Sequence, residues 1–101
     1  MDLRDVRKLL TTFPAVTEEP HFELWSARVG GKIFATWPAD GSELRVFVDA
    51  ERARTLAAAG PWQELWWGKT LSGVRVALPG PASIAEVLKE AWARKAPKRL
   101  R

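Results

Sequence analysis

The chain has 101 residues, 47% of them hydrophobic and 28% charged, with no cysteine and a net charge of +4. These values indicate one folded domain over residues 1–101 and exclude a disulfide scaffold, a thiol nucleophile and a thiolate metal site. No apolar run approaches the ~20 residues of a membrane span, and the charged start is unlike a signal peptide. We therefore expect a cytoplasmic protein without membrane contact.

The first predicted element is an amphipathic helix from Leu3 to Phe13, in which apolar residues recur every three or four positions. Asp2 is suited to cap this helix, and Pro14 is expected to end it. Residues 15–23 are predicted to form an acidic connector.

Three strands are predicted in the middle of the chain. Segments 24–29 and 32–37 are joined by Gly30-Gly31, a pair that supplies the positive φ angles of a two-residue hairpin. Residues 43–48 alternate between apolar and other side chains, which is typical of a strand. The sequence therefore predicts a three-stranded antiparallel meander.

A short helix over residues 50–59 follows, with Asp49 as its cap and Gly60-Pro61 at its end. Residues 62–73 fit either a strand with a loop or an aromatic loop throughout. Residues 74–78 alternate as a strand does.

The final helix is predicted to begin with a capping box formed by Ser83 and Glu86 and to end at Pro97. Its apolar stripe comprises Ile84, Val87, Leu88, Ala91 and Trp92. These elements predict an α+β fold in which an antiparallel sheet is covered by helices on one face.

The positive charge of the chain is concentrated at its end. The last ten residues read WARKAPKRLR and hold five basic side chains and no acidic one. The preceding 91 residues hold 11 basic and 12 acidic side chains, a sum of −1. This distribution favours contact between the C-terminal segment and an anionic partner.

No catalytic or nucleotide-binding motif is present. The single histidine, His21, lies near Glu18, Glu19 and Glu23, which follow no metal-ligand spacing. The Gly30-Gly31-Lys32 segment precedes a strand, so it lacks the helix N-terminus that holds a phosphate. We expect no enzyme, no cofactor and no bound metal.

The remaining class of function is binding, and the sequence indicates two candidate partners. Basic hairpins and a basic tail favour nucleic acid, DNA in particular, held mostly by phosphate contacts. The predicted contact residues are Arg28, Lys32, Arg45, Lys69, Arg75, Arg94, Lys95, Lys98 and Arg99. The alternative is a protein-interaction module with an exposed patch of Trp62, Trp66 and Trp67. Each tryptophan also fits core packing, because one indole can bury ~150–250 Å².

Two segments resemble the MmcQ/YjbR family: PHFELWSARVGGKIFATW at 20–37 and AWARKAPKRL at 91–100. The similarity extends from Leu3 to Leu100. It implies an α-β(3)-α-β(2)-α fold, CyaY-like (that is, frataxin-like) and secretion-chaperone-like in shape, with a strand inside residues 62–73. It also implies DNA binding of the double-wing type, in a family whose biochemical role is poorly defined.

By position, the resemblance implies that the first wing is the hairpin 24–37 and the second is the hairpin that ends at 74–78. Many family members have a tryptophan directly after the glycine of the later strand, whereas this chain has Gly73-Val74. The second wing therefore departs from the family pattern. We also expect Pro97 and Leu100 to dock the chain end on the sheet.

Overall fold

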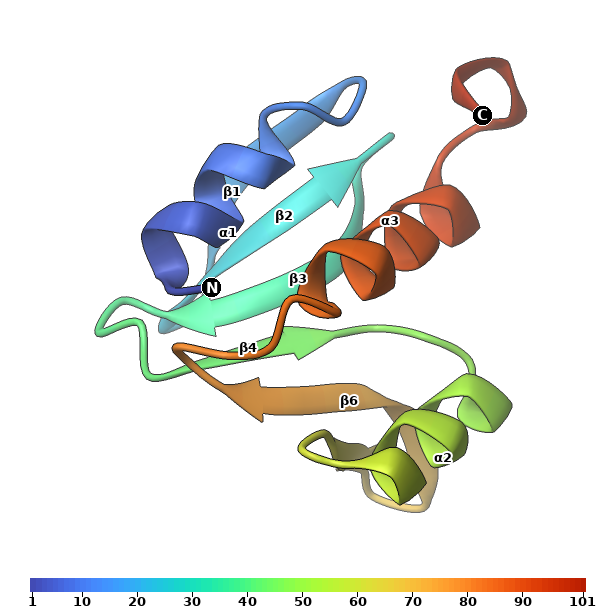
Figure 1. Ribbon diagram of the computed structural model, residues 1–101. Helices are drawn as coiled ribbons and strands as arrows, with labels where there is room; N and C mark the ends of the chain where they lie inside the picture. The colour runs from blue at the N-terminus through green and yellow to red at the C-terminus, as the bar shows by residue number, and fades with distance from the viewer.

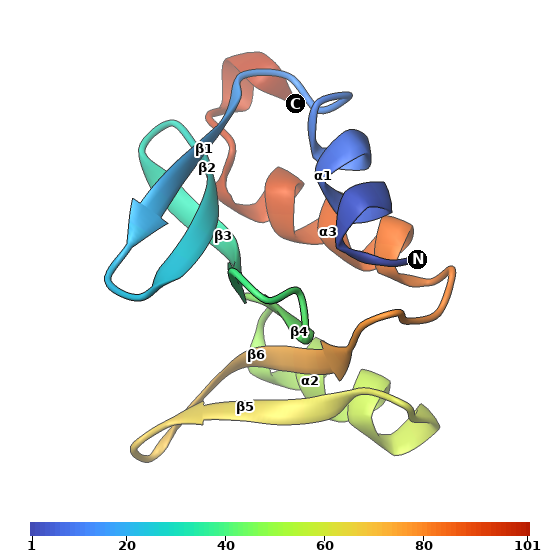
Figure 2. The same ribbon diagram turned by 90° about the vertical axis from the view of Figure 1, so that its left-hand side faces the viewer.

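The computed structural model describes residues 1–101. A single six-stranded sheet has the order β1-β2-β3-β4-β6-β5, and every neighbouring pair is antiparallel. The three helices lie on one face of this sheet (Figure 1). The sheet bends so that the β1–β2 and β5–β6 turns project to the same, helix-free side (Figure 2). The predicted fold class is confirmed.

The elements, in chain order, are α1 (Leu3–Leu10), β1 (Val16–His21), β2 (Leu24–Val29), β3 (Lys32–Pro38), β4 (Glu43–Val46), α2 (Ala50–Ala59), β5 (Gln63–Trp67), β6 (Thr70–Ala77) and α3 (Ile84–Lys95). A short 3₁₀ helix, Lys98–Leu100, follows α3. None of the helices is both long enough and apolar enough to span a bilayer.

Helix α1 begins as predicted and ends earlier. Asp2 accepts a hydrogen bond from the backbone N–H of Asp5 at 2.9 Å, and Asp5 accepts one from that of Asp2 at 3.0 Å. The hydroxyls of Thr11 and Thr12 donate to the carbonyl oxygens of Lys8 and Leu9, each at 2.6 Å. These bonds satisfy carbonyls at the helix end, so the last turn does not continue to Phe13.

The prediction of a connector over residues 15–23 is wrong. Val16–His21 form β1, which pairs with β2 from Val16 opposite Val29 to His21 opposite Leu24. The strand lies at the sheet edge with mostly exposed side chains, so it shows no apolar alternation. Pro20 inside it is tolerated because an edge strand need not donate every N–H. The meander before α2 therefore has four strands.

The remaining sheet follows the predictions closely. Gly30 and Gly31 have φ of 58° and 78°, as the predicted hairpin turn requires. The strand implied within residues 62–73 is β5, and it pairs with a longer β6 that begins at Thr70. Strand β4 ends at Val46, two residues before its predicted end.

The predicted capping box of α3 does not form. Ser83 has helical dihedral angles and makes no cap hydrogen bond with its side chain. Turn bonds from Ile84 N–H to the Pro81 carbonyl and from Ala85 N–H to the Ala82 carbonyl satisfy the first amides instead. The Ser83 hydroxyl is thereby left to accept the indole N–H of Trp62 at 3.4 Å.

The hydrophobic core is one cluster of 22 buried residues, drawn from the sheet and all three helices. The predicted apolar stripe of α3 is buried in full. Phe34 and Trp37 of β3 are the largest fully buried side chains of the core. Leu100 packs against this cluster, and Pro97 lies near Gly30 in the turn between β2 and β3.

Candidate functional site

Two of the predicted contact residues are engaged within the protein. Arg28 donates to the Ser26 hydroxyl at 3.0 Å and to the Pro20 carbonyl at 3.3 Å, and its side chain is only 24% exposed. Arg45 forms an ion pair with Glu43 at 2.6 Å through its Nε. Neither guanidinium therefore projects freely from the surface as an exposed wing tip would require.

Lys32 lies beside the basic C-terminal segment. A Cβ on Gly30 would be 3.2 Å from ring atoms of Pro97, so the β2–β3 turn contacts the chain just after α3. Lys32 adjoins this turn and is exposed, as are Lys98 and Arg99. Figure 1 shows the C-terminal segment beside the end of β2.

We call this region the basic end. Its six residues share a place near the β2–β3 turn or in the last turn of α3 and beyond, and none belongs to an ion pair. They are Lys32, Arg94, Lys95, Lys98, Arg99 and Arg101. The other two predicted cations, Lys69 and Arg75, are exposed in the β5–β6 hairpin.

The three predicted patch tryptophans have different environments. Trp62 is 4% exposed and belongs to the core, so it is not part of a surface patch. Trp66 and Trp67 are 48% and 61% exposed. The Trp67 ring meets Phe47 in an edge-to-face contact with the ring centroids 5.3 Å apart.

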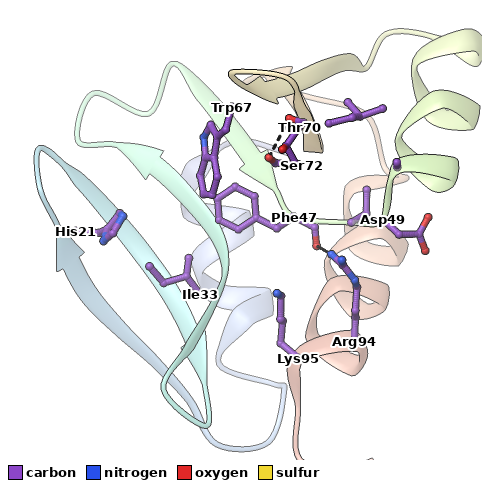
Figure 3. A pocket seen from close by; sticks show the side chains of 12 residues that line it. His21, Ile33, Phe47, Asp49, Trp67, Thr70, Ser72, Arg94 and Lys95 are labelled. Carbon is purple, nitrogen blue, oxygen red and sulfur yellow. Dashed lines mark hydrogen bonds between the residues drawn. The ribbon is translucent and has the colours of Figure 1, made fainter.

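A cleft opens near Trp67 on the helix-free face (Figure 3). It comprises two hollows of about 480 and 180 Å³, which share His21, Phe47 and Trp67 in their walls. Arg94 and Lys95 of α3 border the larger hollow, and Thr36 borders the smaller one. The cleft therefore joins the β1–β2 and β5–β6 turns to the basic end.

Two residues that border the smaller hollow, Phe22 and Thr36, differ sharply in their exposure to solvent. Phe22, in the β1–β2 turn, is 95% exposed and has a positive φ of 56°. Thr36 is 2% exposed, and its hydroxyl has no hydrogen-bond partner. Leaving a buried hydroxyl unpaired costs about 1–3 kcal/mol, so this atom is unusual in a folded protein.

Ser26 lies opposite Thr36 on β2, and its hydroxyl differs from that of Thr36 in having hydrogen-bond partners. Ser26 is also buried, yet its hydroxyl donates to the Glu19 carbonyl at 2.7 Å and accepts from Arg28 at 3.0 Å. The hydroxyl of Ser26 therefore has hydrogen-bond partners, whereas the buried hydroxyl of Thr36, a residue that borders the smaller hollow, has none.

Sequence reasoning does not select Phe22, Thr36 or Phe47 as site residues. Each fits a strand or turn without special notice, because the cleft is formed by segments distant in sequence. The sequence favours a surface or structural histidine over a metal ligand at position 21, and it does not indicate that the His21 ring meets Phe22 edge-on with the ring centroids 4.8 Å apart. No group of three histidine, aspartate or glutamate side chains has a metal-binding arrangement.

These features define an α+β protein with a bent antiparallel sheet, helices on one face and an aromatic cleft on the other. The model of the YjbR family matches residues 11–94, and the chain belongs to this family. Its fold is similar to the crystal structure of Deinococcus radiodurans protein DR2400, a DUF419 domain. The TM-score is 0.81 at 23% identity, over 99% of this chain and 82% of that one. No curated protein matches the sequence.

Proposed function

We propose that this protein binds nucleic acid through phosphate contacts made by the basic end. The observation that carries the proposal is the packing of Gly30 on Pro97, because it brings Lys32 beside the basic run that ends the chain. A role in binding rather than catalysis is part of the same proposal.

The charges of the basic end support phosphate binding. Its six cations have no ion-pair partner within the protein, and residues 92–101 contain no acidic side chain. Phosphate contacts release counterions, so six of them would give a slope of about −5 in log affinity against log salt. Raising salt from ~50 to ~200 mM would then weaken binding by about 10³-fold.

The two wings implied by the family resemblance do not contribute equally to this proposal. The first wing supplies Lys32, while Arg28 is held along the sheet by Ser26 and Pro20. The second wing supplies the exposed Lys69 and Arg75. We therefore assign the primary phosphate contacts to the basic end and a supporting role to the second hairpin.

The test is fluorescence anisotropy with a labelled DNA duplex at ~50 and ~200 mM salt. The variant Lys98→Ala/Arg99→Ala is compared with Arg4→Ala/Lys8→Ala, which removes two exposed, unpaired charges from α1. We expect the first variant to lose affinity and salt sensitivity and the second to resemble the unmodified protein. Absence of binding at low salt, or equal effects of both variants, would overturn the proposal.

A second candidate function is protein interaction, favoured by the exposure of Trp66 and Trp67, 48% and 61%. Exposed aromatic side chains are common in interfaces. Such an interface would be nearly insensitive to salt and would fail on Trp66→Ala, which separates it from phosphate binding.

A further inference from the structure

We infer that the cleft binds one nucleotide unit, a planar heteroaromatic base with its phosphate, from an unpaired strand or as a free nucleotide. This inference rests on the proposed nucleic-acid binding, and it names the part of the ligand that the helix-free face takes. Three features of the cleft carry it: aromatic walls, an unpaired buried hydroxyl and cations at one end.

The aromatic walls offer a stacking surface. Trp67 is 61% exposed although its ring is held edge-to-face by Phe47, which is 9% exposed. Phe22, which also borders the smaller hollow, is 95% exposed, and its ring meets that of His21 edge-on with the ring centroids 4.8 Å apart. Rings held in place and left open to solvent are the feature that proteins use to stack unpaired bases.

The floor offers hydrogen bonding to the edge of a ring. Thr36 borders the smaller hollow, and its hydroxyl oxygen is buried and unpaired. Rotation of this side chain toward the hollow would let the hydroxyl donate and accept a hydrogen bond there. Arg45 borders the same hollow, and only its Nε is bonded to Glu43, so its terminal nitrogens have no partner. A base carries ring nitrogens and exocyclic groups that would satisfy these atoms, whereas an aliphatic or phenyl group would not.

The cations lie where a phosphate would follow the base. Arg94 and Lys95 border the same hollow as Trp67. One terminal nitrogen of Arg94 donates to the Phe47 carbonyl at 3.5 Å, and the rest of the guanidinium has no hydrogen-bond partner. Figure 3 shows the Lys95 amino group directed toward Phe47. Asp49 also borders this hollow, but its carboxylate accepts the backbone N–H of Arg52 at 2.8 Å as the cap of α2. Arg94 and Lys95 also belong to the basic end, so a strand bound there is continuous with the cleft.

Paired bases would not satisfy this arrangement. In a duplex each base is stacked on both faces and hydrogen-bonded along its pairing edge, so its ring cannot meet Trp67 and Thr36 together. The inference therefore requires a preference for unpaired over paired nucleic acid, which phosphate contacts alone do not produce.

The experiment measures binding of three probes to the full chain: a ten-base single strand, its duplex, and adenosine monophosphate. The variants are Trp67→Ala and Thr36→Val, and Trp66→Ala is the matched control because Trp66 is exposed and lies outside both hollows. Thr36→Val keeps the shape of the side chain, so the variant is expected to fold.

We expect tighter binding of the single strand than of the duplex. Trp67→Ala should weaken single-strand binding by about 5- to 150-fold, the effect of losing one base–aromatic stack. Thr36→Val should weaken it by about 5-fold, and neither variant should affect the duplex. If the monophosphate binds with the same sensitivity, the cleft takes free nucleotides; if only the strand binds, it takes a base from a strand.

The inference is overturned if the duplex binds as tightly as the single strand and Trp67→Ala changes neither; the proposed phosphate binding would then stand. Failure of all three probes would overturn both. A cleft that receives a protein partner would also leave nucleic-acid affinity insensitive to Trp67→Ala, and that result counts against the inference.

Discussion

Gly73 of β6 lies directly against the backbone of Val46 at the end of β4. A Cβ on Gly73 would be 2.9 Å from the Cα of Phe47 and closer still to the Val46 carbonyl oxygen. All of these are backbone atoms, so no side-chain rotation could relieve the contact. Since Phe47 lines the cleft, the absence of a side chain at Gly73 helps to determine the position of the cleft wall.

We predict that Gly73→Ala destabilises the protein by about 3 kcal/mol or more, at the upper end of overpacking costs, because β4 and β6 must separate. Gly68→Ala is the control: Gly68 has a positive φ of 57°, but a Cβ added there would have nothing within 4 Å. The control should show only the conformational cost of about 1–2 kcal/mol. Urea denaturation measures both, and equal losses would contradict the steric explanation.

The tryptophans provide a second comparison. Trp62→Ala should destabilise the protein by about 3–5 kcal/mol, since it removes a large side chain from the core. Trp66→Ala should remain within about 0.5 kcal/mol of the unmodified protein, because the side chain is half exposed. Urea denaturation measures both changes in stability. A large loss of stability in Trp66→Ala would contradict the prediction, because it would show that this side chain supports the fold.

The sequence predicted the elements whose signals are local. Asp2 and Asp49 cap α1 and α2 as expected, and Gly30-Gly31 forms the predicted turn. Strand β1 was missed because it lies at the sheet edge with mostly exposed side chains, so its sequence has no apolar alternation. The capping box predicted at Ser83 does not form, because carbonyl oxygens of the preceding turn already accept the first backbone N–H groups of α3. This turn conformation cannot be deduced from the residue types.

The turn at Gly30 links the fold to the proposed function. Alanine at Gly30 or Gly31 meets a similar cost of positive φ, but only at Gly30 would the new Cβ press on Pro97, at 3.2 Å. We predict that Gly30→Ala displaces the C-terminal segment and makes the salt slope of duplex binding shallower by about 1. Gly31→Ala should leave the slope unchanged. Anisotropy titrations at several salt concentrations measure both slopes, and equal slopes for the two variants would contradict the prediction.

The cleft could not be predicted from the sequence for a different reason. Phe22, Thr36 and Trp67 come from two hairpins and the central strand, and only the bend of the sheet brings them together (Figure 2). Their residue types carry no spacing that marks a site. An unpaired hydroxyl is visible only once every possible partner has been placed.

That hydroxyl leads to a prediction about stability. Thr36→Val removes an unpaired buried polar atom at nearly constant volume, so the variant should be more stable by about 1 kcal/mol. Ser26→Ala on the facing strand should instead destabilise by about 1 kcal/mol, because its hydroxyl makes two hydrogen bonds. Thermal or urea denaturation tests both signs; a less stable Thr36→Val would show that the hydroxyl is paired.

The final prediction concerns pH and the start of α1. The pKa of the Asp2 carboxyl is lowered from 3.8, chiefly because the carboxylate accepts the backbone N–H of Asp5. A carboxyl whose pKa is lower in the folded state stabilises the fold above its unfolded pKa, and the contribution is lost as pH falls through the folded pKa. Asp2→Asn keeps an acceptor but cannot ionise, so it should be less stable than the unmodified protein at neutral pH. As the pH falls well below 3.8, the two proteins should converge.

The variant Asp2→Ala separates the charge of this cap from its hydrogen bond. It removes the acceptor itself, so it should stay less stable than the unmodified protein at every pH. Urea denaturation across the acidic range measures these differences. A stability gap between the unmodified protein and Asp2→Asn that widened in acid would contradict the assignment, because the ionised carboxylate would then not be the stabilising form.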